Sequence, residues 1–429
     1  MSETKPLRVA LAGLGTVGGG VIRLIDANGD LIARRAGRRI EIVAVSARDR
    51  AKDRGVDIAR FGWVDDTTRL AEAEADVIVE LIGGADGPAL ALARATLAGG
   101  KGLVTANKAM IAHHGLELAT AAEAARAALK FEAAVAGGIP VIKGLREGAA
   151  ANEIARVYGI LNGTCNFILS KMESEGRDFA DVLAEAQRLG FAEADPGFDI
   201  DGVDAAHKLS ILASIAFGTQ PAFAGVETGG IRDILAADIA EAAALGFRVR
   251  LLGLAEAGRD GLFQRVHPHL VPLDHPLAHV TGATNAVVAE GNFVGRLLFQ
   301  GAGAGDGPTA SAVVADLIDI ARGEYGPPYA MPAAALAQTG RADAGNRRGR
   351  AYVRFTVADK VGVLAEIAAA MRDAGVSIES LMQRGRAGDG TVLVAIVTHE
   401  GPERAVAHAL ETLRGSPSLA GAPLWMHIL

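Results

Sequence analysis

Carboxylate groups gather around one lysine near the middle of the chain. Asp204 and Lys208 are four residues apart, so on a helix they share one face. The following residues, LSILASIAF, are apolar on nearly every side, which predicts that this helix is buried. Glu193, Asp199 and two further aspartates precede the pair. One alternative is a surface ion pair worth about 0.2–1 kcal/mol. Once buried, the same residues favour acid–base catalysis or binding of an ammonium-bearing substrate.

Lysine is rare in this sequence, which makes the retained lysines candidates for proton transfer. Only nine of the 43 cationic residues are lysines. Arginine keeps its proton near neutral pH, whereas a partly desolvated lysine can release one. Lys108 ends the stretch VTANK directly after a predicted strand, and ligands of parallel sheets bind at that edge. A lysine at the start of an ordinary helix is the alternative.

A glycine-rich turn near the N-terminus has the spacing of a dinucleotide-binding site. Gly13, Gly15 and Gly18 fit G-x-G-x-x-G, which here follows a buried strand and opens a helix. The first glycine permits the tight turn, the second lets a pyrophosphate approach the backbone, and the third lets the helix pack on the strand. With Thr16 and Val17 at the helix N-terminus, the turn is predicted to bind a dinucleotide cofactor rather than to be a plain strand–helix turn.

The end of the second predicted strand bears on the choice between NAD and NADP. An acidic residue there would bind the ribose 2′-hydroxyl of NAD, but the sequence is Ser46-Ala47-Arg48. A guanidinium group can bind a 2′-phosphate with two donors. Arg48 therefore favours NADP, or the use of both cofactors, over the alternative that it is a solvated surface charge.

A parallel sheet is needed to position these residues. Strands alternate with helices over residues 1–130, which indicates right-handed βαβ units and a Rossmann-type, doubly wound α/β fold. We expect the helix after the glycine turn to stop at Asn28. Further helices are expected over 88–99 and 115–128, and strands over 7–12, 40–46, 76–82, 102–106 and 130–135.

The remaining chain predicts two further parts. Residues 131–301 are expected to form an inserted α+β catalytic and dimerisation domain, with helices over 140–151, 166–175, 178–189 and 203–217 and strands over 153–161, 247–255 and 263–270. A helix over 308–322 would return to the first domain, which residues 302–335 complete. After a linker over 336–349, residues 350–429 follow the order strand, helix, strand, strand, helix, strand, a ferredoxin-like βαββαβ unit.

Composition excludes several classes of protein. Half of the 429 residues are apolar and the net charge is −7, which fits a folded protein and argues against nucleic-acid or membrane binding. We find no apolar segment long enough to cross a membrane and no signal peptide. Cys165 is the only cysteine, so a reducing cytoplasm is the expected location.

Three stretches resemble the homoserine dehydrogenase family. They are AQRLGFAEADPGFDIDGVDAAHK over 186–208, LNGTCNFIL over 161–169 and GAGAG over 301–305, and the resemblance extends over about residues 7–325. The resemblance implies the reversible, NAD(P)-dependent conversion of L-homoserine to L-aspartate 4-semialdehyde, a step towards threonine and methionine. It implies that Lys208 is the general acid/base, that Asp204 orients it, and that Lys108 lies near nicotinamide and substrate.

The resemblance also implies the remaining site residues. The substrate would contact Glu193 and Asp199 at its amino end, together with Gly163 and Thr164. The cofactor would contact Thr105, Gly303 and Gly305 as well as the glycine turn. A monovalent cation such as Na⁺ would be held by the Glu132 carboxylate and the backbone carbonyls of Val135, Gly137 and Ile139. An ordinary strand-to-turn segment is the alternative for this cation site.

The C-terminal unit resembles an ACT domain, a small amino-acid-sensing module. The match lies in DKVGVL over 359–364 and in Gly375. It implies edge-to-edge pairing, hence a homodimer or homotetramer, and feedback regulation by threonine. A purely structural dimerisation module is the alternative.

Two other groups of residues carry less weight. His267, His269, His275 and His279 lack the compact paired spacing of a zinc site. Cys165 has no evident base nearby in sequence, so it is expected to be a core residue and not a nucleophile. Two other functions stay open: a catalytically silent amino-acid-binding regulator, and an NADP oxidoreductase acting on another amino-acid-derived alcohol.

Overall fold

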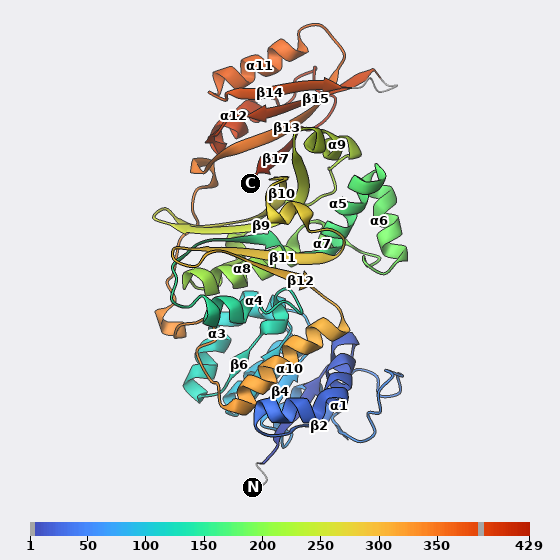
Figure 1. The fold of residues 1–429 in the computed structure, drawn as a ribbon, viewed down its shortest axis with the longest axis vertical. Coiled ribbons are helices and arrows are strands. Elements are labelled where there is room, and N and C mark those ends of the chain that lie inside the picture. Colours follow the sequence, from blue (N-terminus) through green and yellow to red (C-terminus); the bar gives the residue numbers. More distant parts are fainter. Residues whose placement is uncertain (1–4, 385–389) are drawn as a thin grey trace.

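Three parts of the chain are stacked along its longest axis (Figure 1). The structure is a computed structural model and describes residues 5–384 and 390–429. The N-terminal part holds a parallel six-stranded sheet, and the other two parts share one eleven-stranded sheet. The predicted α/β class, with a mixed second sheet and a C-terminal βαββαβ unit, is confirmed.

The N-terminal sheet has the strand order β3-β2-β1-β4-β5-β6, with β1 at its centre. Val9, Ala10 and Leu11 of β1 are fully buried because helices cover both faces of the sheet. The strands are β1 (Leu7–Ala12), β2 (Ile40–Ser46), β3 (Gly62–Trp63), β4 (Val77–Glu80), β5 (Gly102–Thr105) and β6 (Leu129–Lys130). The helices that follow β1, β4 and β5 are α1 (Thr16–Ala36), α2 (Pro88–Ala98) and α3 (Lys108–Ala125).

Helix α10 (Asp306–Arg322), which comes much later in the chain, returns to pack on α1 (Figure 1). Gly20 of α1 lets the two backbones approach, because a Cβ there would lie 2.8 Å from the Asp306 carbonyl oxygen. An ion pair between Arg23 and Asp306 at 2.6 Å also joins the two helices. Helix α10 therefore lies beside the N-terminal part, and its assignment to that domain stays a prediction.

Several predicted boundaries in this half of the chain are wrong. The helix expected over 115–128 is α3, which begins at Lys108 because Asn107 caps it there. Asn28 has non-helical angles (φ −117°, ψ 15°), yet α1 continues to Ala36, because a single kinked residue does not end the packed apolar face. Strand β6 ends at Lys130, and a 3₁₀ turn over Glu132–Ala134 replaces the rest of the expected strand. The helix expected over 140–151 is one turn, α4 (Val141–Lys143), followed by a π-helical segment over Gly144–Gly148.

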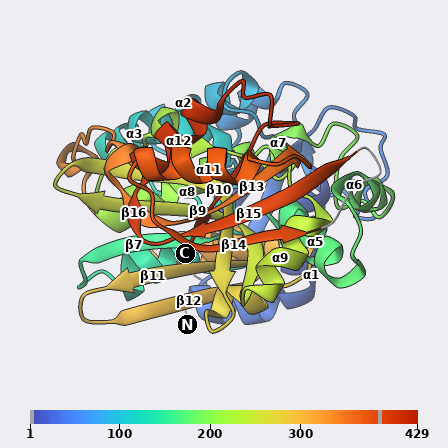
Figure 2. The same cartoon turned by 90° about the horizontal axis from the view of Figure 1, so that it is seen from above.

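The second sheet has the order β12-β11-β7-β9-β10-β17-β13-β15-β14. From above, β12, β11 and β7 follow one another inward from one side of the molecule (Figure 2). Its strands are β7 (Ile154–Ile160), β9 (Phe247–Gly258), β10 (Gly261–Pro272), β11 (Thr284–Gly291), β12 (Gly295–Ala302), β13 (Arg348–Ala358), β14 (Ile378–Arg384), β15 (Thr391–Thr398) and β17 (Leu424–Ile428), with the short β8 (Glu227–Thr228) and β16 (Gly401–Pro402) at its margins. Strands β11 and β12 were not predicted.

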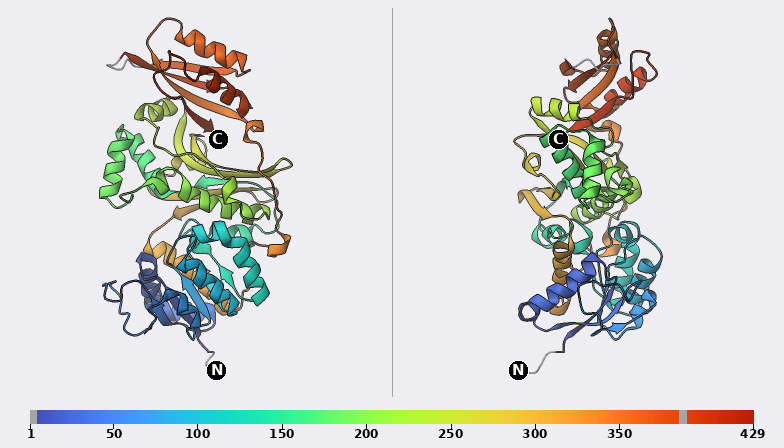
Figure 3. Two further views of the ribbon diagram at one scale, coloured as in Figure 1. Left: turned by 180° about the vertical axis from the view of Figure 1, so that it is seen from behind. Right: turned by 90° about the vertical axis from the view of Figure 1, so that its right-hand side faces the viewer.

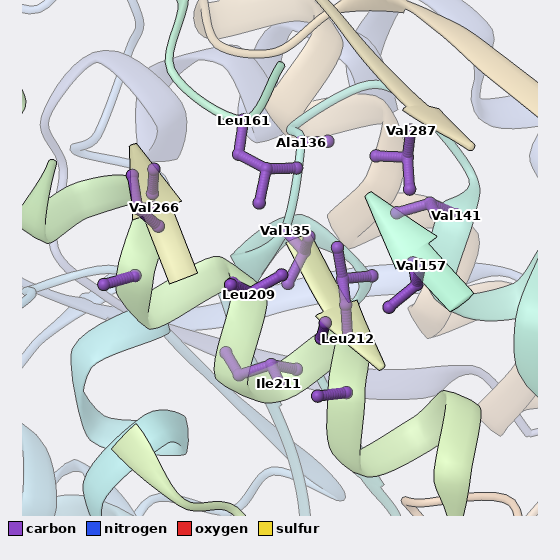
Figure 4. Close-up of a cluster of buried hydrophobic side chains, with 14 of the residues drawn as sticks. Val135, Ala136, Val141, Val157, Leu161, Leu209, Ile211, Leu212, Val266 and Val287 are labelled. Carbon is purple, nitrogen blue, oxygen red and sulfur yellow. The ribbon is translucent and has the colours of Figure 1, made fainter. Parts of the chain in front are cut away.

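The helices of these two parts cover the shared sheet. They are α5 (Gly163–Glu175), α6 (Phe179–Arg188), α7 (Gly197–Ile200), α8 (Val203–Phe217), α9 (Ala236–Ala244), α11 (Val363–Asp373) and α12 (Glu403–Leu413). Helix α8 is the most buried of them: Leu209 and Leu212 pack among Val157 and Val287 of the sheet (Figure 4). The apolar LSILASIAF run was therefore correctly predicted to be a buried helix.

The C-terminal unit is joined to the middle part by paired strands. Residues His269 and Leu270 of β10 pair in parallel with His427 and Ile428 of β17. Beside this pairing, the Arg265 guanidinium donates to both oxygens of Glu403 at 3.1 and 2.7 Å, and both side chains are buried. The predicted linker is also held by isolated β-bridges, which join Ala337 to Thr219 and Arg341 to Leu262. It runs along one side of the molecule towards the C-terminal unit (Figure 3). Within the described ranges, no helix is long and apolar enough to cross a membrane.

Candidate active site

A cavity of about 880 Å³ lies between the N-terminal and middle parts. Both Val17 of the glycine turn and Lys208 of α8 line it. Half of the predicted site residues line this cavity: besides Val17 and Lys208, they are Lys108, Gly137, Gly163, Thr164, Asp199, Asp204, Gly303 and Gly305. The fold therefore brings together residues that are up to 288 positions apart, from Val17 to Gly305.

A buried carboxylate lies between two lysines at one end of the cavity. The Lys208 ammonium donates to Asp204 Oδ2 at 2.7 Å and to the Leu161 carbonyl oxygen at 2.8 Å. The Lys108 ammonium is 3.1 Å from the other oxygen, Asp204 Oδ1. Burial would raise the pKa of Asp204, but the two ammonium groups and a hydrogen bond from Asn162 hold it well below its ordinary value. Asp204 therefore remains ionised and fixes both lysines.

Asn162 links this pair to the start of α5. Its Oδ1 accepts a hydrogen bond from the Cys165 N–H at 2.8 Å, as an N-cap residue does. Its Nδ2 donates to Asp199 Oδ1 and to Asp204 Oδ2, both at 2.9 Å. The Thr164 hydroxyl is 3.1 Å from Asp199 Oδ2. One asparagine thus sets the positions of two carboxylates at once.

The glycine turn has the shape that a dinucleotide needs. Gly13 has φ +101°, and a Cβ there would lie 2.6 Å from the Leu81 carbonyl oxygen. A Cβ at Gly18 would lie 2.2 Å from the Gly13 carbonyl oxygen, so the helix packs directly on the turn. Gly15 has no atom within 4 Å of its hypothetical Cβ, and it precedes an α1 N-terminus that no side chain caps. Open space above uncapped N–H groups fits a pyrophosphate.

Family models identify each part of the chain. The model described as homoserine dehydrogenase matches residues 140–318, the model for the homoserine dehydrogenase NAD-binding domain matches residues 13–132, and the ACT domain model matches residues 351–415. A homoserine dehydrogenase of Pseudomonas aeruginosa is 45% identical over 425 residues, which is 97% of each chain. This chain belongs to the homoserine dehydrogenase family. It is accordingly an oxidoreductase with a nicotinamide-dinucleotide-binding domain and an ACT domain.

Solved homoserine dehydrogenases have the same fold. The crystal structure from Thiobacillus denitrificans is 42% identical and aligns with a TM-score of 0.92 over 99% of this chain and 98% of that one. A hyperthermophilic archaeal homoserine dehydrogenase in complex with NADPH is 28% identical and aligns with a TM-score of 0.65 over 76% of this chain and all of that one. The similarity to the Thiobacillus enzyme spans all three parts of the homoserine dehydrogenase fold.

Several predicted site residues of this family member lie outside the cavity lining. Glu193 is exposed, and its carbonyl accepts from Gln187 Nε2 at 2.9 Å. The Thr105 hydroxyl is buried, donates to Glu80 Oε2 at 2.6 Å and accepts from the Asn107 N–H at 2.9 Å. Thr105 therefore shapes the end of β5, and its hydroxyl has both partners in the protein.

The end of β2 also differs from the sequence-based interpretation. Ser46 is fully buried and hydrogen-bonded to the Thr67 hydroxyl at 2.8 Å, so it is not available to a ribose phosphate. Arg48 is exposed beyond the strand and keeps its predicted freedom to bind one. Arg54, which sequence reasoning missed, donates from Nε to the Leu14 carbonyl oxygen of the glycine turn at 3.0 Å.

The predicted cation segment is tightly bonded. Glu132 is buried, and its two carboxylate oxygens accept from the N–H groups of Ile142 and Lys143 at 3.0 and 2.9 Å. The Ile139 carbonyl accepts from the Val141 N–H at 2.7 Å. Burial and the nearby Asp316 carboxylate raise the pKa of Glu132 to about 7. Among the described residues, no group of three histidine, cysteine or acidic side chains is arranged to hold a metal ion.

Proposed function

We propose that the chain catalyses the reversible interconversion of L-homoserine and L-aspartate 4-semialdehyde, with Lys208 as general acid/base. The observation that carries the proposal is the Lys208–Asp204–Lys108 group facing the same cavity as the glycine turn. A bound nicotinamide supplies or accepts the hydride. Such a transfer needs positioning and a proton donor but no protein nucleophile, which agrees with the buried Cys165, whose pKa burial raises well above its ordinary value.

Side chains that line the cavity can supply the proton and bind the substrate's ammonium group. Two of the three Lys208 ammonium donors are engaged by Asp204 and Leu161, which leaves one to face the cavity. In reduction this donor protonates the aldehyde oxygen, and in oxidation the lysine takes the hydroxyl proton back. Asp199 and Thr164 line the same cavity, and the Asp199 carboxylate suits the substrate's ammonium group. We also propose that Glu193 contacts the substrate. Because Glu193 is exposed outside the cavity lining, its segment must move inward to make this contact.

The test is turnover by the full chain with L-homoserine and NADP. Lys208→Met should lower kcat by about 10²- to 10⁴-fold, because the proton donor is lost, while cofactor affinity stays unchanged. Lys171→Met, which alters an ion pair with Glu185 away from the cavity, should keep parental turnover. Turnover of Lys208→Met within threefold of the parent would refute the assignment, and a tenfold preference for another alcohol would refute the substrate.

We propose that NADP is preferred over NAD. Support comes from Arg48, which is exposed just beyond β2, and from the absence of an acidic residue in Ser46-Ala47-Arg48. Arg48→Ala should lower the NADP/NAD ratio of kcat/KM at least fivefold, because one charge-assisted contact is lost. Arg34→Ala, at the far end of α1, is the matched control. An unchanged ratio in Arg48→Ala contradicts the preference.

We propose that a monovalent cation binds beside Glu132, with the carbonyls of Val135, Gly137 and Ile139. The raised pKa of Glu132 reflects a buried carboxylate short of positive charge, which a cation would supply. The backbone turns sharply here, with left-handed φ at Ala136 (+55°) and Gly137 (+49°). A left-handed φ is unfavourable for alanine, so contacts with the rest of the protein must hold this segment in its conformation.

We propose that threonine inhibits the enzyme through the C-terminal unit. Support comes from a cavity of about 350 Å³ at the β13–α11 turn, lined by residues 359–364 and by Gln383, Val392 and Val394. Val361 is fully exposed there, so Val361→Glu should place a charge at the cavity without unfolding the unit. The variant should lose threonine inhibition and keep basal turnover, whereas the exposed Ala420→Glu in the same unit should stay inhibited. Inhibition unchanged in Val361→Glu contradicts the proposal.

We further propose that the chain forms a homodimer or homotetramer in the cytoplasm. The hairpin of β11 and β12 forms one edge of the large sheet and exposes Phe293, Val294 and Leu298. An exposed apolar strand edge is a typical site of association. Light scattering of Phe293→Asp should show a smaller particle than the parent; identical particles contradict this edge as the interface.

A further inference from the structure

Asn285 and the proposed acid/base Lys208 donate hydrogen bonds to the same carbonyl oxygen, that of Leu161. Asn285 is the second residue of β11, is 1% exposed, and donates from Nδ2 to the Leu161 carbonyl oxygen at 3.0 Å. The same oxygen accepts from the Lys208 ammonium at 2.8 Å. Because a carbonyl oxygen can only accept, the amide nitrogen of Asn285 must face it. The orientation of the amide is therefore fixed, and Oδ1 points away from Leu161.

The Asn285 Oδ1 atom has no partner among the described residues. It is buried and makes no hydrogen bond, although Asn285 lines the large cavity. A buried amide oxygen without a donor is unfavourable, and native structures leave few of them. A ligand donor in the cavity would satisfy it.

Two glycines keep the surroundings of this amide clear. A Cβ at Gly303 would lie 2.2 Å from both Cγ and Nδ2 of Asn285 and 2.5 Å from its Oδ1. A Cβ at Gly163 would lie 3.3 Å from the same Oδ1. Leu161 itself is anchored, because its side chain packs into the apolar cluster beside α8 (Figure 4). The acceptor is thus held rigidly, with backbone and not side chains next to it.

We propose that Asn285 Oδ1 accepts a hydrogen bond from the carboxamide amino group of the nicotinamide. Two donors could reach this end of the cavity: the substrate's ammonium group and the cofactor's carboxamide. The ammonium group is better served by the Asp199 carboxylate, which also lines the cavity, whereas the amide oxygen of Asn285 matches a neutral amide donor. Gly303 lies in the segment that leads from β12 to α10, and α10 packs on α1, the helix that follows the glycine turn. This end of the cavity is therefore on the nucleotide side. The inference rests on the proposed reaction at Lys208.

This contact would give Asn285 a role in orientation. The carboxamide is attached beside the reacting carbon of nicotinamide, so holding it fixes the ring. Since Asn285 and Lys208 share the Leu161 oxygen, one peptide group sets both the ring and the proton donor. Asn285 is then a cofactor-recognition residue that sequence motifs did not indicate.

The test measures binding and not turnover. Dissociation constants are compared for NADP⁺ and its 3-acetylpyridine analogue, in which a methyl group replaces the carboxamide amino group. The parent should bind the analogue about fivefold more weakly, as expected for one neutral hydrogen bond. Asn285→Ala should weaken NADP⁺ by the same factor, leave the analogue unchanged, and so abolish the discrimination.

Two further variants keep the test decisive. Asn166→Ala removes another buried asparagine with an unpaired Oδ1 that does not line the cavity, and it should discriminate as the parent does. Asn285→Thr suits a strand and serves if the alanine variant does not fold. Discrimination that persists without Asn285, or a raised KM for homoserine alone, overturns the proposal. Because the readout is nucleotide affinity, it stays interpretable even if Lys208 proves not to be the acid/base.

Discussion

The junction between β10 and β17 should make the protein sensitive to mild acid. His269 of β10 is 2% exposed and donates from Nδ1 to the His267 carbonyl oxygen at 2.7 Å. Burial lowers its pKa from 6.5 to about 3. Burial and the nearby Arg265 likewise lower the pKa of His267 to about 4. Both imidazoles are therefore neutral in the folded protein at pH values where the unfolded chain would carry a charge.

The sign and the size of the effect follow from linkage. Below pH 6.5 the unfolded chain binds a proton at His269 that the folded chain does not bind until about pH 3. Stability is therefore complete above pH 6.5 and is lost as the pH falls through this window. One pKa unit corresponds to about 1.4 kcal/mol, so His269 alone should cost about 2 kcal/mol at pH 5. That is a large share of the net stability of about 5–15 kcal/mol typical of a folded domain.

Urea unfolding at pH 7.5 and pH 5.0 provides the measurement. Trp425 lies 4.9 Å from the His427 ring, centroid to centroid, and its fluorescence reports on this junction. His269→Gln should be less stable at pH 7.5, but it should lose about 2 kcal/mol less than the parent between the two pH values. His279→Gln, at an exposed histidine, should follow the parent. Equal losses in the parent and in His269→Gln would refute the claim that folding keeps this imidazole neutral.

Three other predictions concern close packing and buried charge. Gly303→Ala should lower the free energy of unfolding by about 1–3 kcal/mol through overpacking, measured by urea unfolding, and should reduce kcat/KM about tenfold in steady-state assays. Gly307→Ala should change neither quantity, because a Cβ at Gly307 would have no atom within 4 Å. Asp238→Ala removes a fully buried partner of a guanidinium and should cost about 3–5 kcal/mol by calorimetry; a loss equal to that of the exposed Asp260→Ala contradicts this. Replacing Na⁺ with tetramethylammonium should lower the parent Tm by about 2–4 °C but leave Glu132→Gln unaltered, and equal shifts would argue against the cation.

Local patterns predicted the parts of the site that depend on short stretches of chain. The glycine turn and the Asp204–Lys208 pair each lie within one turn or one helix, so spacing alone fixes their geometry. Likewise, the apolar run in α8 predicted burial correctly. These features follow from residue type and helix periodicity, without knowledge of the fold.

The parts that were missed depend on contacts between distant segments. Asn162 and Asn285 reach Asp204 and Leu161 from separate elements, and nothing in either residue's neighbours signals this. Strands β11 and β12 were missed because the outer strand, β12, alternates between exposed and half-buried residues and holds two glycines. The availability of Ser46 was misjudged because its half-buried partner, Thr67, lies in a 3₁₀ turn that follows β3.

The continuity of the large sheet limits what deletion variants can tell about regulation. A chain cut before β13 would lose β17 and leave the hydrogen-bonding edge of β10 open along His269 and Leu270. It would also leave the buried Arg265 without Glu403. Open edges recruit other chains, and Arg265, left with Glu227 at 3.3 Å as its remaining carboxylate partner, would lose its buried ion pair with Glu403. A shortened enzyme that fails to respond to an effector would then be a misassembled enzyme, so point substitutions on the C-terminal unit are the sound way to separate sensing from assembly.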